Sequence, residues 1–337
     1  MAKALGLNSQ ITIENVAVPV TREELQLDDV QLDPENPRIR EQLKQMGKTG
    51  KINGKELRQV ILDISGVSTL LRSVRENKGL HEPIYIRHDG RVAEGNCRTA
   101  IYQFLREAQK NEKCWQTIPV WRLPKDVTER QIAVLQGHMH VAGKITWRAH
   151  EQAGHLFRMN RELKMKPAEI SAAMRMSETE VNRQIQAYET MTNDVIPRMK
   201  GDGREKFSHV LEFYKNRKLK DFRTDEKNVK LFTDLVVKDK LKKGADVRKL
   251  HKILAHEGGK KTLQKEGFDK ALALVGKTDP TADSALFRKL KTATKALEEI
   301  RRPVLDRIGA GTAEKRILQN LHTALKRVAD ATGTTIK

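Results

Sequence analysis

The stretch from residue 83 to residue 123 limits the fold more than any other part of the sequence, because it predicts a strand hairpin that leads directly into a helix. The hairpin turns at His88-Asp89-Gly90, which contains the Asp-Gly pair favoured in two-residue hairpin loops. Residues Arg98 to Lys110 then carry apolar side chains at helical spacing, and Ile118 to Leu123 is typical of a further strand. This order of elements predicts an α/β domain.

A candidate phosphate site lies where the predicted hairpin ends and the helix begins, at Gly95-Asn96-Cys97-Arg98. The first backbone N–H groups of a helix have no partner within the helix, and the helix dipole favours negative charge at that end. Arg98 adds a guanidinium group that can hold a phosphate with two hydrogen bonds. The turn therefore predicts an anion site.

Three motifs in the expected order resemble the N-terminal domain of the ParB/sulfiredoxin superfamily. Leu32 to Arg38 resembles the N-P-x-x-P-R box that opens such domains, with Asp33 in place of the first Asn. After this box the family has a helix and then a G-x-x-x-P-I motif, which Val67 to Asn77 and Gly79 to Ile84 resemble. Gly95 to Arg98 resembles the family's G-E-R-R or G-N-x-R box. The resemblance covers about residues 28 to 190 and implies a ParB-like α/β domain followed by a helix-turn-helix.

The resemblance also implies a nucleotide pocket, because some ParB-like partition proteins bind CTP. The expected ligand is CTP or ATP with Mg²⁺, and the predicted nucleotide-binding residues are Gly95, Asn96, Arg98, Thr99, Arg38 and Lys144. The sequence departs from the family at Cys97, which replaces the first Arg of G-E-R-R, and at Gln136 to His140, where an acidic residue and an amide are expected. A carboxylate normally holds magnesium against a triphosphate, so nucleotide hydrolysis is left open.

Cys97 raises the question of reductase chemistry, because sulfiredoxins carry a reactive cysteine in a G-G-C-H-R box before a helix. A thiol at a helix N-terminus beside Arg98 would have a lowered pKa. However, Cys97 is one residue closer to the arginine than in that box, and the histidine is absent. The sequence favours a packing role for Cys97.

Metal chemistry is not favoured by the spacing of the candidate ligands. His138 and His140 lie two residues apart, which is not a recurring zinc spacing, and no cysteine or carboxylate completes the set. A metal-dependent nuclease needs convergent carboxylates, whereas the candidate acids are scattered along the chain: Asp33, Glu35, Glu94 and Glu151. We therefore expect no bound metal ion apart from the magnesium of a nucleotide.

Lys166 to Tyr188 has the pattern of two helices joined by a short turn. Pro167 to Met174 predicts the first helix, and Ser177 with Glu180 forms a capping box for the second. An ordinary helical hairpin would give the same pattern, but its place after the ParB-like motifs favours a DNA-reading helix-turn-helix. The predicted DNA-binding residues are the N-cap and the outward-facing positions of the second helix: Ser177, Thr179, Glu180, Asn182, Arg183 and Gln186.

The charge of the chain points to a polyanionic partner. The 337 residues carry a net charge of +20, and residues 193–337 account for +15 of it, with 35 Lys and Arg against 20 Asp and Glu. Aromatic side chains stand among lysines and arginines between Phe207 and Lys220. Such a segment can contact phosphates, or it can be a solvated basic face without a ligand, and charge alone leaves both open. Two apolar stripes at helical spacing follow, from Leu286 to Ile300 and from Ile317 to Val328. In partition proteins the last helices of this region usually mediate dimerisation, so the resemblance implies a homodimer.

Composition also sets the expected location. Two cysteines without paired metal spacing indicate a reducing compartment. No apolar run is long enough to span a bilayer, and the first residues lack an apolar signal core. We expect a bacterial, cytoplasmic protein associated with a nucleoid or plasmid and not with a membrane.

The sequence thus predicts an α/β ParB/sulfiredoxin-like domain, then an all-α helix-turn-helix and a basic all-α C-terminal domain. The expected boundaries are 1–27 for an N-terminal arm or edge strand, 28–126, 127–192 and 193–337. The expected function is binding of double-stranded DNA in plasmid or chromosome partition or a related mobile-element process, regulated by CTP or ATP. The alternative is an enzyme, an NTPase or a nuclease, that uses the same pocket.

Overall fold

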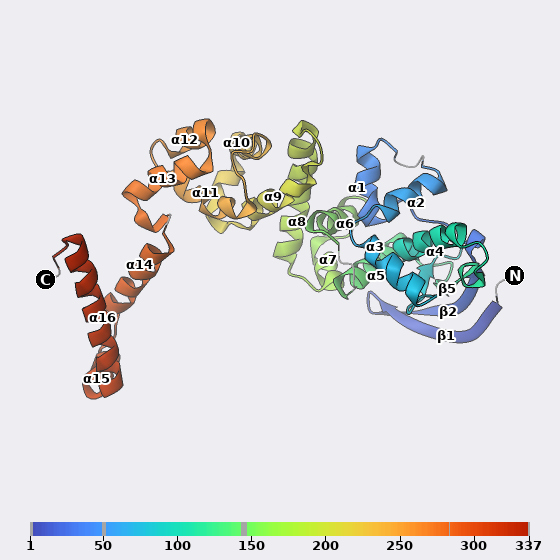
Figure 1. Ribbon diagram of the computed structural model, residues 1–337, viewed down its shortest axis with the longest axis horizontal. Helices are drawn as coiled ribbons and strands as arrows, with labels where there is room; N and C mark the ends of the chain where they lie inside the picture. The colour runs from blue at the N-terminus through green and yellow to red at the C-terminus, as the bar shows by residue number, and fades with distance from the viewer. Residues whose placement is uncertain (1–2, 49–51, 143–146, 283, 336–337) are drawn as a thin grey trace. The chain divides into compact units, whose positions relative to one another are not determined.

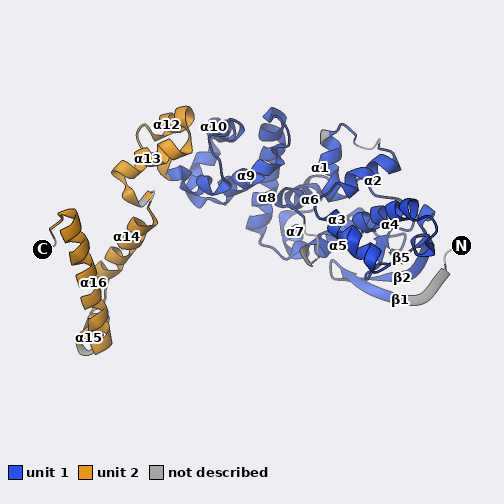
Figure 2. Ribbon diagram, viewed as in Figure 1, with its two compact units in different colours: residues 1–251 blue, residues 252–337 orange. Residues whose placement is uncertain are grey.

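The computed structural model describes residues 3–48, 52–142, 147–282 and 284–335 (Figure 1). The chain divides into two compact units, residues 1–251 and 252–337 (Figure 2). The four-part division expected from the sequence is finer than this and stays a prediction.

The first unit begins with a mixed five-stranded sheet in the order β1-β2-β5-β3-β4. The strands are β1 (Lys3–Ile13), β2 (Val16–Gln26), β3 (Ile84–Ile86), β4 (Val92–Glu94) and β5 (Thr117–Arg122). Neighbouring strands are antiparallel except for β3 and β5, which are parallel. The hairpin of β3 and β4 and the strand β5 confirm the elements predicted for residues 83–123.

The N-terminal segment is built into the sheet more fully than the sequence indicated. β1 is an edge strand, as expected, whereas β2 lies between β1 and β5 and pairs with β5 from Thr21 to Gln26. The turn between β1 and β2 is Glu14-Asn15, and both residues have positive φ, 51° and 63°. Two-residue hairpin loops favour this conformation, but without a glycine the turn gave no clear signal in the sequence.

The α/β part contains four helices: α1 (Pro37–Gln45), α2 (Gly54–Leu62), α3 (Val67–Glu76) and α4 (Asn96–Ala108). α3 and α4 share a core with the sheet, whereas α2 packs on α4 and α1 on α6 (Ala149–Arg161). α4 is the predicted helix, and it begins two residues before Arg98. Its residues Ile101 and Leu105 are fully buried in a core shared with β3 and β5. Trp115 closes this core, with its ring edge-on to Tyr102 at 5.2 Å between centroids.

The rest of the first unit is helical. Its α-helices are α5 (Glu129–Ala142), α6 (Ala149–Arg161), α7 (Pro167–Met174), α8 (Glu178–Thr190), α9 (Phe207–Lys215) and α10 (Glu226–Val237), and α11 (Leu250–Ala255) contains the boundary between the units.

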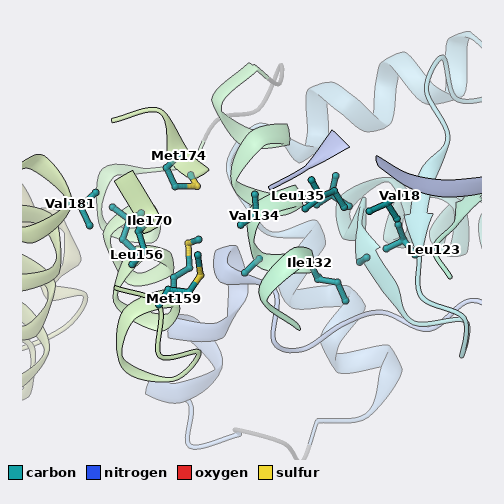
Figure 3. Close-up of a cluster of buried hydrophobic side chains, with 14 of the residues drawn as sticks. Val18, Leu123, Ile132, Val134, Leu135, Leu156, Met159, Ile170, Met174 and Val181 are labelled. Carbon is teal, nitrogen blue, oxygen red and sulfur yellow. The ribbon is translucent and has the colours of Figure 1, made fainter. Parts of the chain in front are cut away.

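One hydrophobic core joins the sheet to the helices α5 to α8 (Figure 3). It contains Val18 of β2, Leu123 after β5, Leu135 of α5, Met159 of α6 and Val181 of α8, all buried. Because side chains from both parts fill the same core, the positions of α7 and α8 are fixed relative to the sheet.

The second unit consists of helices: α12 (Gly259–Glu266), α13 (Phe268–Thr278), α14 (Ala285–Glu298), α15 (Arg302–Ala310) and α16 (Thr312–Thr332). α12 and α13 pack together, and their residues Leu263, Ala271 and Val275 are buried. In contrast, none of the described residues of α14 is buried, and Ala329 is the buried one in α16. The observed fold class is therefore α/β followed by all-α, as predicted. In the described part of the chain, no helix combines the length and the hydropathy needed to cross a membrane.

Candidate functional site

The helix pair α7–α8 is defined by local signals in the sequence. Pro167 starts α7 at its first turn, and Arg175 ends it in the left-handed conformation with φ of 53°. Ser177 caps α8, because its hydroxyl accepts a hydrogen bond from the backbone N–H of Glu180 at 3.2 Å. The two predicted helices and the turn between them are present.

Two glycines allow the neighbouring helices to approach this pair closely. A Cβ at Gly137 of α5 would lie 2.5 Å from the side chain of Met174, and one at Gly154 of α6 would lie 2.9 Å from the ring of Tyr188. On the inward face of α8, Val181, Ile185 and Tyr188 are buried. The inward face of α8 is therefore held tightly, and its other face is presented outward.

The outward face of α8 forms one wall of a cleft of about 790 Å³. Four of the six predicted DNA-binding residues line it: Thr179, Asn182, Arg183 and Gln186. The structure therefore brings these four side chains together on one concave surface.

The other two predicted residues have structural partners. Ser177 is the N-cap of α8, as described above. The carboxylate of Glu180 contacts Lys215 at 3.2 Å and Arg183 at 3.8 Å, and it accepts a hydrogen bond from Gln184 at 3.2 Å. Glu180 is thereby neutralised within the protein and ties α8 to α9.

The opposite wall of the cleft comes from the segment 214–224, at the end of α9 and in the two short 3₁₀ turns η6 (Arg217–Leu219) and η7 (Asp221–Thr224). Its lining residues are Tyr214, Arg217, Lys220, Arg223 and Thr224. The sequence marked this stretch as basic and aromatic but gave no sign that it faces α8, because that contact depends on how α9 packs.

Arg223 holds this wall in place. Its guanidinium donates hydrogen bonds to the carbonyl oxygens of Phe213 and, at 2.9 Å, Asn216. It also lies 5.6 Å from the ring centroids of Phe213 and Tyr214. Burial lowers the pKa of Arg223 and raises that of Tyr214, whose hydroxyl is hydrogen-bonded to Thr190 of α8 at 2.7 Å. The two walls are thus joined directly.

The predicted nucleotide site is a sharp turn that only glycine accommodates. Gly95 has φ of 114°, and a Cβ there would lie 2.5 Å from Ile84 Cγ2. The helix α4 starts at the next residue, so its first N–H groups lie at this turn, as expected.

Asn96 and Thr99 make internal hydrogen bonds at this turn. The amide of Asn96 accepts from the backbone N–H of Asp33 at 3.0 Å and donates to the Asp33 carbonyl at 2.7 Å. The hydroxyl of the buried Thr99 donates to the Gly95 carbonyl at 3.2 Å. Both side chains are therefore engaged within the protein, and Asn96 holds the first and third motifs together.

Arg98 is held in place by the protein as well. Its guanidinium forms an ion pair with Glu94 and donates to the carbonyl oxygens of Glu82 at 2.8 Å and Pro83 at 3.2 Å. Arg38 is buried, with Nη1 3.8 Å from Cys97 Sγ and Nε 4.0 Å from the carboxylate of Glu151. The sixth predicted nucleotide-binding residue, Lys144, lies outside the described residues.

The thiol of Cys97 behaves differently from the expectation for a reactive cysteine. Burial raises the pKa of Cys97, and this effect outweighs the lowering influence of Arg38 and Arg98. The expected lowering by the helix N-terminus was therefore wrong, because the side chain packs into the core instead of facing solvent.

The stretch from Gln136 to His140 packs between the sheet and the helices. Gln136 is buried and donates to the carbonyl of Ala93 at 2.8 Å, and His138 Nε2 lies 2.6 Å from the Ala173 carbonyl oxygen. His155 is fully buried with a pKa lowered to about 3 by desolvation. Among the described residues, no three side chains of the kinds that ligate metals are grouped.

No protein-family model and no curated protein matches the chain. Several solved structures are similar to it, among them the following three. One is the C-terminally truncated chromosome-partitioning protein ParB from Caulobacter crescentus complexed to the centromeric parS site, with 12% identity over 68% of this chain and 97% of that chain and a TM-score of 0.34.

The same Caulobacter protein complexed with CTP-γ-S matches with 14% identity over 63% of this chain and 97% of that chain, at a TM-score of 0.22. A Pnob8-like ParB-N domain matches with 12% identity over 76% of this chain and 97% of that chain, at a TM-score of 0.29. All three are described as ParB or ParB-N structures.

Proposed function

We propose that the chain is a ParB-like protein that binds double-stranded DNA with the outward face of α8. The observation that carries the proposal is that Thr179, Asn182, Arg183 and Gln186 line one wall of an open cleft in a strongly basic protein. An α-helix of 13 residues is about 20 Å long and fits the major groove, which is roughly 12 Å wide.

The side chains on this wall suit distinct contacts. Asn182 and Gln186 carry amides, which pair with the N6 and N7 positions of adenine, and Arg183 suits guanine or a phosphate. Asn182 and Gln186 lie four residues apart, so they are neighbours on one helix face. Glu180, which is neutralised by Lys215 and Arg183, is left out of the base contacts.

Selection of duplexes from a random library, followed by fluorescence anisotropy, tests this proposal. We expect a preferred sequence, and Asn182→Ala should reduce the preference by about 1–3 kcal/mol, the discrimination of one bidentate base contact. Gln264→Ala, which changes an exposed helical glutamine of α12, is the matched control and should leave the preference unchanged. Equal binding of all duplexes by the unmodified protein would refute base reading by α8.

We further propose that two copies associate through α14 and α16. Both predicted apolar stripes are exposed, with Leu286 62% and Ile317 67% accessible. Contiguous exposed apolar side chains of this kind typically mark an interaction surface. A second copy is the occupant that fits the DNA proposal, because paired reading helices bind two half-sites of one operator. Light scattering should show a dimer, and Ile317→Glu should yield a monomer; an unmodified protein that is monomeric at all concentrations would refute this.

Nucleotide binding is a separate part of the proposal. The N–H groups at the start of α4 and the guanidinium of Arg98 fit a phosphate, whereas Asn96 and Thr99 are used internally. Arg98 would have to leave Glu94 to reach it. No three-residue set for Mg²⁺ occurs among the described residues. Calorimetry with CTP, ATP and GTP tests this part, and we expect binding of one nucleotide that is lost in Arg98→Ala. Absence of binding in the unmodified protein would refute it and leave the DNA proposal untouched.

A further inference from the structure

The second wall of the cleft carries two basic side chains whose charge is not used inside the protein. Arg217 and Lys220 are exposed, and in the described part of the chain neither forms an ion pair. Three other basic side chains of this region are paired: Lys215 with Glu180, Lys206 with Asp239, and Arg248 with Glu212.

The backbone that carries these two residues is firmly held. Leu219, which lies between them, is buried with 1% of its surface accessible. Asn216 caps the η6 turn by accepting from the N–H of Lys218 at 3.1 Å, and it donates to the Val247 carbonyl at 3.2 Å. Arg223 binds the carbonyls at the end of α9, as described above. The turn therefore presents Arg217 and Lys220 in a fixed direction toward the space beside α8.

The chemistry of the two walls is different. The α8 wall carries amides and hydroxyls, which can distinguish bases, and its charged residues Arg183 and Glu189 each form an ion pair within the protein. The opposite wall carries the guanidinium of Arg217 and the ammonium group of Lys220. Positive side chains that flank a reading helix contact the sugar–phosphate backbone, which fixes the register of the protein on the duplex without reading sequence.

We propose that Arg217 and Lys220 bind phosphates of the DNA strand that borders the groove entered by α8, so that the cleft is a two-walled clamp. This inference rests on the proposed DNA-binding function and adds a second contact surface, outside the helix pair, with the phosphodiester backbone as its ligand. A double-stranded RNA is a poorer fit, because its deep and narrow major groove does not admit a helix.

The test is a salt titration of DNA affinity with the full chain carrying Arg217→Gln and Lys220→Gln. Each phosphate contact contributes about 0.9 to the slope of log K against log salt concentration. We therefore expect the slope of the double variant to be less steep by about 1.8. Affinity should fall equally for the selected duplex and for a scrambled one, because phosphate contacts carry no sequence information.

A matched control separates a local contact from a general loss of charge. Arg72→Gln with Arg75→Gln removes two exposed charges at the same spacing from α3 of the α/β part. This control should keep the slope of the unmodified protein. Three results would overturn the proposed clamp. The slope could change equally in both double variants, or the Arg217→Gln/Lys220→Gln variant could change its sequence preference. The third is equal binding of an RNA duplex of the same sequence.

The outcomes also separate this inference from the function on which it rests. If the unmodified protein shows a flat salt dependence, both are overturned. If it binds with a steep slope, and Asn182→Ala reduces sequence preference while the Arg217/Lys220 variant keeps the full slope, the clamp alone is overturned. Both changed side chains are exposed, and thermal midpoints of the two double variants equal to that of the unmodified protein will show that folding is retained.

Discussion

The buried amide of Asn96 decides whether the turn at Gly95 is a structural tie or a ligand site. The side chain is 4% accessible, and its amide oxygen and nitrogen each form a hydrogen bond with the backbone of Asp33, 63 residues away. If this pair of bonds is structural, Asn96→Ala leaves one N–H and one C=O of Asp33 buried without partners. Each unpaired group costs about 1–3 kcal/mol, so the variant should lose about 2–6 kcal/mol of unfolding free energy.

Thermal and urea unfolding followed by tryptophan fluorescence will measure this loss. Trp115 is buried beside α4 and reports on this part of the fold. A loss of about 2–6 kcal/mol corresponds to a fall in Tm of roughly 4–24 °C for a unit of this size. Asn77→Ala is the control, because Asn77 is exposed at the end of α3 and should cost no more than about 0.5 kcal/mol.

The opposite result would show that Asn96 serves a ligand. If Asn96→Ala keeps the stability of the unmodified protein without nucleotide but loses the affinity for CTP or ATP, the tie to Asp33 is unimportant and a structural role for Asn96 is refuted. The resemblance to the G-N-x-R box would then have identified a true nucleotide ligand.

Three further results are expected. Glu94→Gln should release Arg98 from its ion pair and increase nucleotide affinity in calorimetry; an unchanged or lower affinity would contradict the restraint of Arg98 by Glu94. Gly95→Ala should lower the unfolding free energy by about 2–4 kcal/mol, because alanine is strained at φ of 114° and its Cβ would meet Ile84; a stability equal to that of the unmodified protein would argue against this turn. The pKa of His155 falls from its ordinary 6.5 to about 3 on folding, so the unfolded chain binds more protons between these values and stability is lost as the pH falls from 6.5 toward 3. In urea unfolding, the stability of His155→Gln should therefore depend less on pH in that window. The same pH dependence as in the unmodified protein would exclude His155 as the cause of the loss.

The elements of residues 83–123 were predictable because their signals are local. The Asp-Gly turn, the glycine before α4 and the apolar spacing of α4 each act within a few residues. The same holds for the helix pair, whose cap at Ser177 depends on a contact three residues away. The turn at Glu14-Asn15 has positive φ without a glycine, and so the place of β2 inside the sheet was not predicted.

The partners of the predicted site residues were harder to foresee, because they come from distant parts of the chain. Asn96 is tied to Asp33, and Glu180 is neutralised by Lys215. The basic wall at Arg217 and Lys220 faces α8 only because α9 folds back against it. Residue type indicated which side chains can bind a phosphate or a base, whereas tertiary contacts decide which of them are available.

The core that joins the sheet to α5, α6, α7 and α8 has a consequence for how this protein can be divided. Leu135 of α5 and Val18 of β2 lie in the same cluster as Ile170 and Val181 of the helix pair (Figure 3). A fragment that begins near residue 127 would lose the sheet side of this cluster and expose the apolar face of α5 to water. The helix pair is therefore not a module that can be transplanted by itself. Limited proteolysis should yield a resistant fragment that retains β1 and β2 together with α8.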